Sequence, residues 1–209
     1  IRGLDMTALL SNFRNTIILS VILALVVVYG FGHSPTHFDA GYWQAVFRLL
    51  HVFFGILWIG LLYYFNFVQI RVMPQIPAEL KPAVSKYIAP EALFWFRWAA
   101  LFTWVMGVIL AFSRGYLLEA ATLGLAGGYT PGQDMGFTFI GTGMWLGTIM
   151  FFNVWVFIWP NQKIALGMVE ADADAKAKAA KLAMLFSRTN TLLSLPMLAT
   201  MAMNQTVFG

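Results

Sequence analysis

One histidine, His51, lies inside a stretch of sequence that is apolar enough to cross a membrane. The stretch from Arg48 to Gln69 reads RLLHVFFGILWIGLLYYFNFVQ. An ionisable side chain at membrane depth is costly, and it therefore indicates a functional site. Gly55 and Trp58 follow His51 at helical spacing, so the three residues share one helix face. A glycine at that spacing leaves room for a flat ligand against the helix.

This pattern is typical of a membrane haem site, with His51 as the iron ligand and Gly55 and Trp58 beside the cofactor. A neutral imidazole can ligate iron through one nitrogen while the other nitrogen donates a hydrogen bond. The alternative is structural: a neutral histidine that hydrogen-bonds a neighbouring helix, because polar side chains also hold membrane helices together. No second histidine lies in an apolar stretch, so a haem b would be five-coordinate or would take a methionine as its second ligand.

Other chemistry is restricted by what the sequence contains. Cysteine is absent, which excludes disulfides, thiolate metal sites, a c-type haem and a cysteine nucleophile. No motif identifies catalytic residues, so the sequence leaves open whether the protein is an enzyme. Four amide side chains in apolar stretches are expected to be buried and to find partners inside a helix bundle. They are Asn153, Asn190, Asn204 and Gln205.

Composition places the chain in a membrane. Of its 209 residues, 60% are hydrophobic and only 11% are charged, whereas a soluble domain carries about 25% charged residues. The net charge of +4 does not indicate nucleic acid, because the basic residues are spread over loops. We therefore expect an all-α, polytopic membrane bundle that forms a single domain over residues 1–209, with the lipid bilayer as its surroundings.

Five membrane-spanning helices are predicted, at about 15–31, 42–72, 90–113, 137–159 and 182–207. Pro90 is expected in the first turn of the third helix, and Pro160 is expected just beyond the fourth. Residues 170–181 should form a charged, solvated helix that continues into the fifth span. Eleven of the thirteen basic residues fall on one side of this arrangement, which predicts a cytoplasmic N-terminus and an external C-terminus in a bacterial inner membrane. Only Arg48 and Arg114 fall on the external side.

Four segments in order carry a family resemblance: RLLHVFFGILWIGLLYYFNF, PEALFWFRWAALFTWVMGV, FFNVWVFIWPNQK and SRTNTLLSLPMLATMAMNQ. Together they resemble the N-terminal membrane domain of bacterial urate hydroxylase, the urate oxidase N-terminal family, over roughly Tyr42 to Gln205. The pattern H-x-x-x-G-x-x-W-x-G is also similar to a helix in small haem-b membrane proteins of the protoporphyrinogen oxidase type and in copper-resistance membrane proteins. In the haem proteins the histidine of that helix ligates haem, and the resemblance carries this role to His51.

Two departures from the urate hydroxylase pattern are visible. That family typically continues into a C-terminal cytochrome c domain, and its last helix often has histidine where this chain has Gln205. The resemblance therefore implies a urate hydroxylase-like redox protein that uses a separate cytochrome or other membrane subunits as partners. The alternative is a non-catalytic accessory subunit of a larger respiratory or photosynthetic complex. A transporter or channel is disfavoured, because almost no charge is buried in the spans.

Overall fold

The computed structural model describes residues 9–31, 38–126 and 135–208, and every regular element in these ranges is a helix. The chain divides into two compact units, Ile1–Val46 and Phe47–Gly209. The other two histidines, His33 and His37, lie outside the described residues.

The first unit contains α2 (Phe13–Phe31) and the beginning of α3 (Ala40–Tyr63). The boundaries of α2 lie close to those predicted, because its run of Ile, Leu and Val is uninterrupted by proline or charge. The side chain of Asp39 accepts a hydrogen bond of 2.8 Å from the backbone N–H of Tyr42. This bond satisfies one of the free N–H groups at a helix start and explains why α3 begins here.

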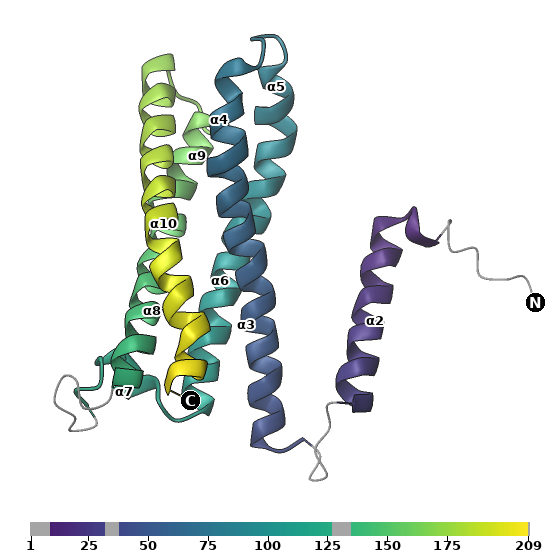
Figure 1. Cartoon of the computed structure of the whole chain (residues 1–209). Coiled ribbons are helices and arrows are strands. Elements are labelled where there is room, and N and C mark those ends of the chain that lie inside the picture. Colours follow the sequence, from purple (N-terminus) through teal and green to yellow (C-terminus); the bar gives the residue numbers. More distant parts are fainter. Residues whose placement is uncertain (1–8, 32–37, 127–134, 209) are drawn as a thin grey trace, which may run out of the picture. The chain divides into compact units, whose positions relative to one another are not determined.

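The second unit is a helix bundle (Figure 1). After α3 the chain passes through a π-helical turn, Tyr64–Gln69, into the short α4 (Ile70–Val72) and a 3-10 turn, Met73–Gln75. It returns through α5 (Lys81–Ala83), a second π turn (Val84–Ile88) and α6 (Ala89–Ser113). A short α7 (Leu117–Ala121) leads to α8 (Met135–Phe152), a third π turn (Asn153–Ile158) and α9 (Trp159–Ala165). The last helix is α10 (Ala173–Phe208).

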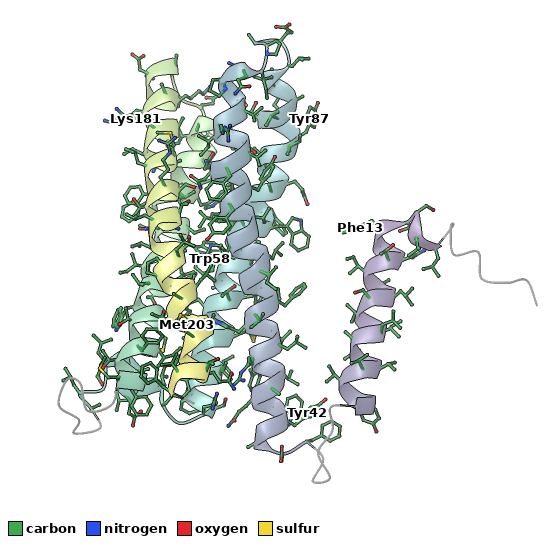
Figure 2. The ribbon with its side chains drawn as sticks, in the orientation of Figure 1. Phe13, Tyr42, Trp58, Tyr87, Lys181 and Met203 are labelled. Atoms are coloured by element: carbon green, nitrogen blue, oxygen red, sulfur yellow. The ribbon has the colours of Figure 1, made fainter. Side chains whose placement is uncertain are left out.

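The hydrophobic core of the bundle is formed by side chains from all of the long helices of this unit. Trp58, which Figure 2 labels, lies in it together with Leu62 from α3, Phe96 from α6, Met150 from α8 and Met197 from α10. Leu62 and Met150 have no exposed surface at all. The predicted face of α3 that carries His51, Gly55 and Trp58 thus turns toward the other helices.

Pro90 lies in the first turn of α6, as predicted, whereas the predicted end of the fourth helix before Pro160 is wrong. Both prolines lie within longer continuous helices. One helix runs from Lys81 to Ser113 past Pro90, and another runs from Met135 to Ala165 past Pro160. Each proline follows a π turn, in which the N–H of Ala89 or Trp159 donates to a carbonyl five residues earlier. Proline has no N–H to donate, and a widened turn before it lets the helix continue.

Four helices are long and apolar enough to span a membrane: Phe13–Gly30, Ala40–Gln75, Lys81–Ser113 and Met135–Ala165. The protein is therefore a multi-pass membrane protein with an all-helical fold in its described residues. The predicted fifth span, α10, is not among these four, and it stays a prediction. As predicted, the charged segment before that span is helical and continuous with it, since α10 begins at Ala173.

The long helix α10 has the reverse polarity of a helix in a soluble protein. Its buried face carries Ser187, Asn190, Ser194 and Thr200, whereas Leu192 and Leu195 are 74% and 69% exposed. Water would favour the opposite arrangement, because burial of apolar surface drives folding in water. Lipid as the surrounding solvent explains it, since polar groups in hydrocarbon must find partners inside the protein.

The two ends of the bundle differ in charge. The connections between α4 and α5 and between α9 and α10 lie at one end, and the connection through α7 and the C-terminus of α10 lie at the other (Figure 1). Arg71, Lys81 and Lys163 belong to helices at the first end. Arg114 follows the last residue of α6, at the second end. Which end faces the cytoplasm stays a prediction.

Candidate functional site at one end of the bundle

His51 is attached to α6 by a hydrogen bond through one of its ring nitrogens. Nδ1 lies 2.8 Å from the backbone carbonyl oxygen of Thr103. A carbonyl oxygen can only accept, so Nδ1 carries the proton and Nε2 keeps its lone pair. Nε2 has no hydrogen-bond partner in the described part of the chain. In its neutral form this imidazole has an unused lone pair on Nε2, and that is the form that ligates metals.

Gly107 allows the imidazole to lie against α6. A Cβ built on Gly107 would come within 2.9 Å of both Cε1 and Nδ1 of His51, closer than real Cβ atoms approach other heavy atoms. Any other residue at position 107 would push the ring away from Thr103. Gly107 has no distinguishing signal in the sequence, because its role depends on how α3 and α6 pack.

The other two residues of the predicted face differ in their surroundings. A Cβ on Gly55 would meet the methyl group of Thr103 at 3.7 Å, an ordinary van der Waals distance. Gly55 therefore faces the same residue of α6 that accepts the bond from His51. Trp58 is only 2% exposed, and its indole Nε1 has no hydrogen-bond partner within the described residues. The structure thus brings His51 and Gly55 together against α6 and places Trp58 deeper in the core.

The predicted amide side chains fall into two groups. Asn153 and Asn190 are buried: Nδ2 of Asn153 donates to Oδ1 of Asn190 at 2.8 Å, and Nδ2 of Asn190 donates to the carbonyl of Met150 at 2.9 Å. Both amides join α10 to the α8 helix and the π turn that follows it. Asn204 is only partly buried and Gln205 is exposed, so the prediction that Gln205 is buried is wrong. Gln205 lies in the last turn of α10, where the bundle ends.

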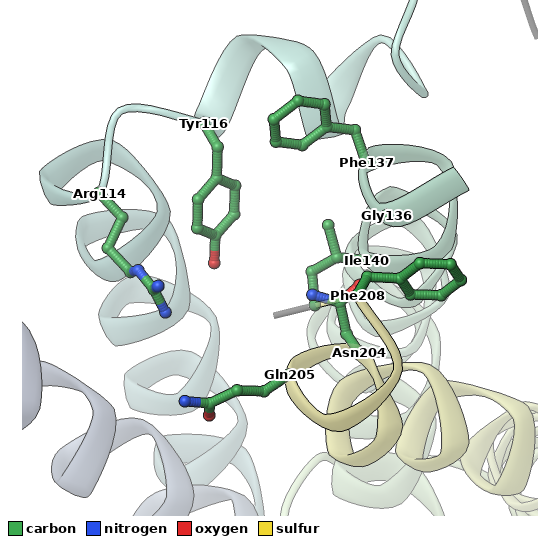
Figure 3. A pocket seen from close by; sticks show the side chains of 8 residues that line it. All are labelled: Arg114, Tyr116, Gly136, Phe137, Ile140, Asn204, Gln205 and Phe208. Carbon is green, nitrogen blue, oxygen red and sulfur yellow. The ribbon is translucent and has the colours of Figure 1, made fainter. Parts of the chain in front are cut away.

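A cavity of ≈ 220 Å³ opens at the end of the bundle where α10 terminates (Figure 3). The polar side chains in its wall come from Arg114 and Tyr116, which lie between α6 and α7, and from Asn204 and Gln205 on α10. Its remaining lining residues are Gly136, Phe137, Ile140 and Phe208. Figure 3 shows that the side chains of Arg114, Tyr116 and Asn204 point into the same space.

Two arginines approach this cavity without a carboxylate partner. Nη1 of Arg48 donates to Oε1 of Gln205 at 2.8 Å. The guanidinium of Arg114 lies 5.9 Å from the centre of the Tyr116 ring and makes no hydrogen bond or ion pair with a described residue. Arg48 lies one helical turn before His51 on α3, so the cavity and the histidine are neighbours along the same helix.

The hydroxyl of Tyr116 is a hydrogen-bond donor at neutral pH. Burial raises the pKa of Tyr116 above its ordinary value, and the positive charges of Arg114 and Arg48 oppose this rise. The phenol therefore keeps its proton at every physiological pH. The described residues offer no hydrogen bond to this hydroxyl.

The described residues contain no group of three or more His, Asp or Glu side chains that could hold a metal ion. His51 is thus a candidate ligand only for a metal that a cofactor already carries. Arg48 and Arg114 are a partial signal for the cavity in the sequence, since they are the two basic residues predicted on the side with little positive charge. Their convergence depends on the packing of α3, α6 and α10, which spacing along the chain does not specify.

The fold and this end of the bundle define a class: a multi-pass helical membrane protein with a neutral histidine between two helices and a cationic cavity next to it. The family described as urate oxidase N-terminal matches residues 135–208 of this chain. This match confirms the predicted resemblance over α8, the third π turn, α9 and α10.

The match covers roughly the last third of the chain and includes two of the four segments that carry the resemblance, FFNVWVFIWPNQK and SRTNTLLSLPMLATMAMNQ. Asn204 and Gln205 lie within it, whereas His51, Thr103 and Gly107 lie outside it. No curated protein and no solved structure matches the chain.

Proposed function

We propose that this urate hydroxylase-like membrane protein is a redox protein that binds haem b, with Nε2 of His51 as the axial ligand. The observation that carries the proposal is the arrangement of the imidazole: its Nδ1–H is held by the Thr103 carbonyl at 2.8 Å, and its Nε2 has no partner among the described residues. A histidine that only joins helices would show the same hydrogen bond, and haem binding distinguishes the two roles.

The residues around His51 suit a haem ligand. Ligating histidines almost always donate their other ring N–H to a carbonyl, carboxylate or water, which fixes the tautomer and raises the basicity of the ligating nitrogen. Thr103 supplies such a carbonyl, and Gly107 leaves the ring room to reach it. When bound, haem would supply one-electron redox chemistry. Methionines such as Met106, next to Gly107, are candidates for a second ligand.

Membrane topology is the second part of the proposal. The buried polar face and exposed apolar face of α10 support a fifth span, even though its average polarity excludes it from the four most apolar helices. With five spans, the basic connections at the α4–α5 end face the cytoplasm of a bacterial inner membrane. The cavity at the C-terminus of α10 then opens to the outside, and His51 lies in the outer half of the bilayer.

An oxidation of substrate would need a route for electrons out of this chain. The described residues provide no second metal site, so a separate cytochrome or other membrane subunits would accept the electrons. The competing function is an accessory subunit of a respiratory or photosynthetic complex, in which His51 would only join helices.

An absorption spectrum of the purified protein, oxidised and then reduced with dithionite, tests the haem proposal. We expect a Soret band and a b-type reduced spectrum in the wild type and in variants of the chain's other two histidines, His33→Gln and His37→Gln. The variant His51→Leu should insert into the membrane normally, because leucine is favourable there, but should contain no haem. A full haem complement in His51→Leu would reject His51 as the ligand.

Two further results would separate the redox and accessory functions. Urate turnover in membranes that contain the wild type, but not in membranes with His51→Ala, would establish catalysis. Absence of visible absorption, together with migration as part of a larger complex on native gels, would favour the accessory subunit. Haem binding without urate turnover in the presence of quinone and cytochrome acceptors would leave a redox protein with another substrate.

A further inference from the structure

Arg97 is a charged residue in the middle of a helix that is long and apolar enough to span the membrane, Lys81–Ser113. Its guanidinium makes no hydrogen bond or ion pair within the described part of the chain. Glu91 is the one carboxylate of α6, and it accepts a hydrogen bond of 3.0 Å from Nε1 of Trp95 instead. Charged residues at membrane depth are costly and are normally paired, so the position of Arg97 calls for an explanation.

Aromatic rings lie beside Arg97 in place of a carboxylate. Its Cζ lies 3.9 Å from the centre of the Trp159 ring and 5.2 Å from that of Phe94. A second cation, Nζ of Lys163, lies 5.6 Å from the same Trp159 ring and has no hydrogen bond or ion pair with a described residue. The face of an aromatic ring attracts cations, but it leaves the N–H groups in the guanidinium plane without acceptors. Two cations therefore share one indole and lack an anion among the residues that the structure describes.

The position of Arg97 along α6 corresponds to the edge of the hydrocarbon layer. Ser113, the last residue of α6, follows Arg97 by 16 positions, or about 24 Å of helix, and the hydrocarbon of a bilayer is about 30 Å thick. Helix side chains tilt toward the N-terminus, so Arg97 reaches further toward the end of the bundle where α9 terminates with Lys163 in its last turn. We therefore expect both cations at the level of the lipid phosphates, where long basic side chains and tryptophan are typical.

An apolar surface continues from Arg97 toward the centre of the bilayer. Phe94, Trp98 and Phe102 are spaced by four residues, share one face of α6 and form what we call the aromatic row. The ring centres are 6.4 Å apart between the first two and 6.1 Å apart between the last two. Phe94 and Phe102 are 41% and 39% exposed, and Trp155 packs edge-on against Trp98 at 5.6 Å. The aromatic row offers an acyl chain a surface that begins beside Arg97.

We propose that the surface between α6 and α9 binds an anionic phospholipid. Arg97 and Lys163 donate hydrogen bonds to its phosphate, Trp159 orients both cations, and one acyl chain packs against the aromatic row. Basic pockets between membrane helices on the cytoplasmic side bind such headgroups, and the topology proposed above puts this end of the bundle in the cytoplasmic leaflet. An inorganic phosphate would use the cations but not the aromatic row. The site needs no cofactor, so it is independent of the haem proposal.

Native mass spectrometry of the full chain in detergent tests the site, because it counts the lipids that stay bound. Phosphatidylglycerol and phosphatidylcholine with identical acyl chains are the matched probes, and they differ in net charge. We expect one phosphatidylglycerol to bind about 10- to 30-fold more tightly than phosphatidylcholine, the effect of two basic residues beside one phosphate. Equal affinities for the two lipids would overturn the proposal. Glycerol phosphate represents the free phosphate and should not displace the lipid; displacement at equal concentrations would overturn the lipid as the occupant.

Variants assign the roles of the two cations. Arg97→Gln should lower the affinity for phosphatidylglycerol by about 10-fold or more, the usual effect of removing one charged hydrogen bond, whereas Arg97→Lys keeps the charge and should retain most of the affinity. Lys163→Gln, in the last turn of α9, should fold normally and lose about five-fold. Arg188→Gln is the control, because Arg188 is an exposed arginine of α10 with no ring contact among the described residues. An equal loss in Arg188→Gln and Arg97→Gln would mean that only general surface charge matters and would overturn the site. Wild-type affinity in both Arg97→Gln and Lys163→Gln would refute it as well.

Discussion

Substitution of Gly107 by alanine should separate the imidazole of His51 from its hydrogen-bond acceptor. The new Cβ would lie 2.9 Å from Nδ1 and Cε1 of His51, and the ring must withdraw by about 0.5 Å to restore an ordinary contact of roughly 3.4 Å. A shift of that size lengthens the Nδ1 to Thr103 oxygen distance from 2.8 Å to about 3.3 Å, which is outside the usual hydrogen-bond range.

The effect should appear at His51 and hardly at all in the stability of the bundle. Loss of one neutral hydrogen bond costs about 0.5–1.5 kcal/mol, while alanine in place of a helix-interior glycine contributes about 0.5–1 kcal/mol of stability. These two terms nearly cancel. Loss of the partner that orients a ligating histidine, by contrast, typically lowers metal affinity by about 10- to 100-fold. Haem affinity should fall by a factor of that order.

Haem titration of the purified variant, followed by its Soret absorption, measures this change. Nitrogen NMR of isotope-labelled histidine gives a readout that does not need haem, since the wild type should show His51 protonated at Nδ1. Gly60 of α3 provides the control, because a Cβ on Gly60 meets nothing within 4 Å. The reasoning is refuted if Gly107→Ala keeps both the wild-type haem affinity and the wild-type His51 tautomer.

Three other predictions concern the amide pair, Tyr116 and the topology. Asn153→Leu should cost about 0.6 kcal/mol, the average for a polar contact between membrane helices, and Asn190→Leu about twice that because it breaks two bonds; equal losses on denaturation in detergent would contradict this. The raised pKa of Tyr116 means that, as the pH rises, the phenol loses its proton in the unfolded chain before it does so in the folded chain. The contribution of Tyr116 to the free energy of unfolding is therefore constant below a pH of about 10 and falls above it. Tyr116→Phe should lessen this fall when unfolding is measured against pH. The chain has no cysteine, so single cysteines can report its topology. An impermeant thiol reagent should label Val207→Cys from outside intact cells and Lys178→Cys only after lysis. Labelling of both variants from the same side would show that α10 does not cross the membrane.

The sequence predicted best what depends on local composition. The boundaries of α2 and the all-helical fold follow from long apolar runs, and the helical form of the charged segment before the last span follows from its alanines. Pro90 was predicted correctly in the first turn of α6, but Pro160 was misplaced because the preference of proline for helix ends is a local rule. The π turn before Pro160 packs Val154 and Ile158 into the core, and this packing has no local sequence pattern.

In the site, too, the sequence identified residues that are recognisable from their neighbours in the chain, and it missed residues whose roles depend on helix packing. His51 was identified because an ionisable residue in an apolar stretch stands out by itself. Gly107 could not be identified in this way, because glycines occur in membrane helices for several structural reasons. Only the contact with the His51 ring shows the role of Gly107. Gln205 was expected inside the bundle on the basis of its polarity, but it ends a helix and reaches Arg48, which is 157 positions away in sequence.

Most of the residues with chemical roles in the site lie outside the part of the chain that matches the family. Arg48 and His51 lie on consecutive turns of α3, and Thr103, Gly107 and Arg114 follow one another along α6 and its end. These helices alone supply the imidazole, its acceptor and both arginines. The matched residues 135–208 supply the other six residues that line the cavity, including Asn204 and Gln205. Whether a relative shares the chemistry depends on its residues at the positions of His51, Gly107 and Arg114. His51 supplies the imidazole, Gly107 leaves room for its ring, and Arg114 supplies positive charge to the cavity.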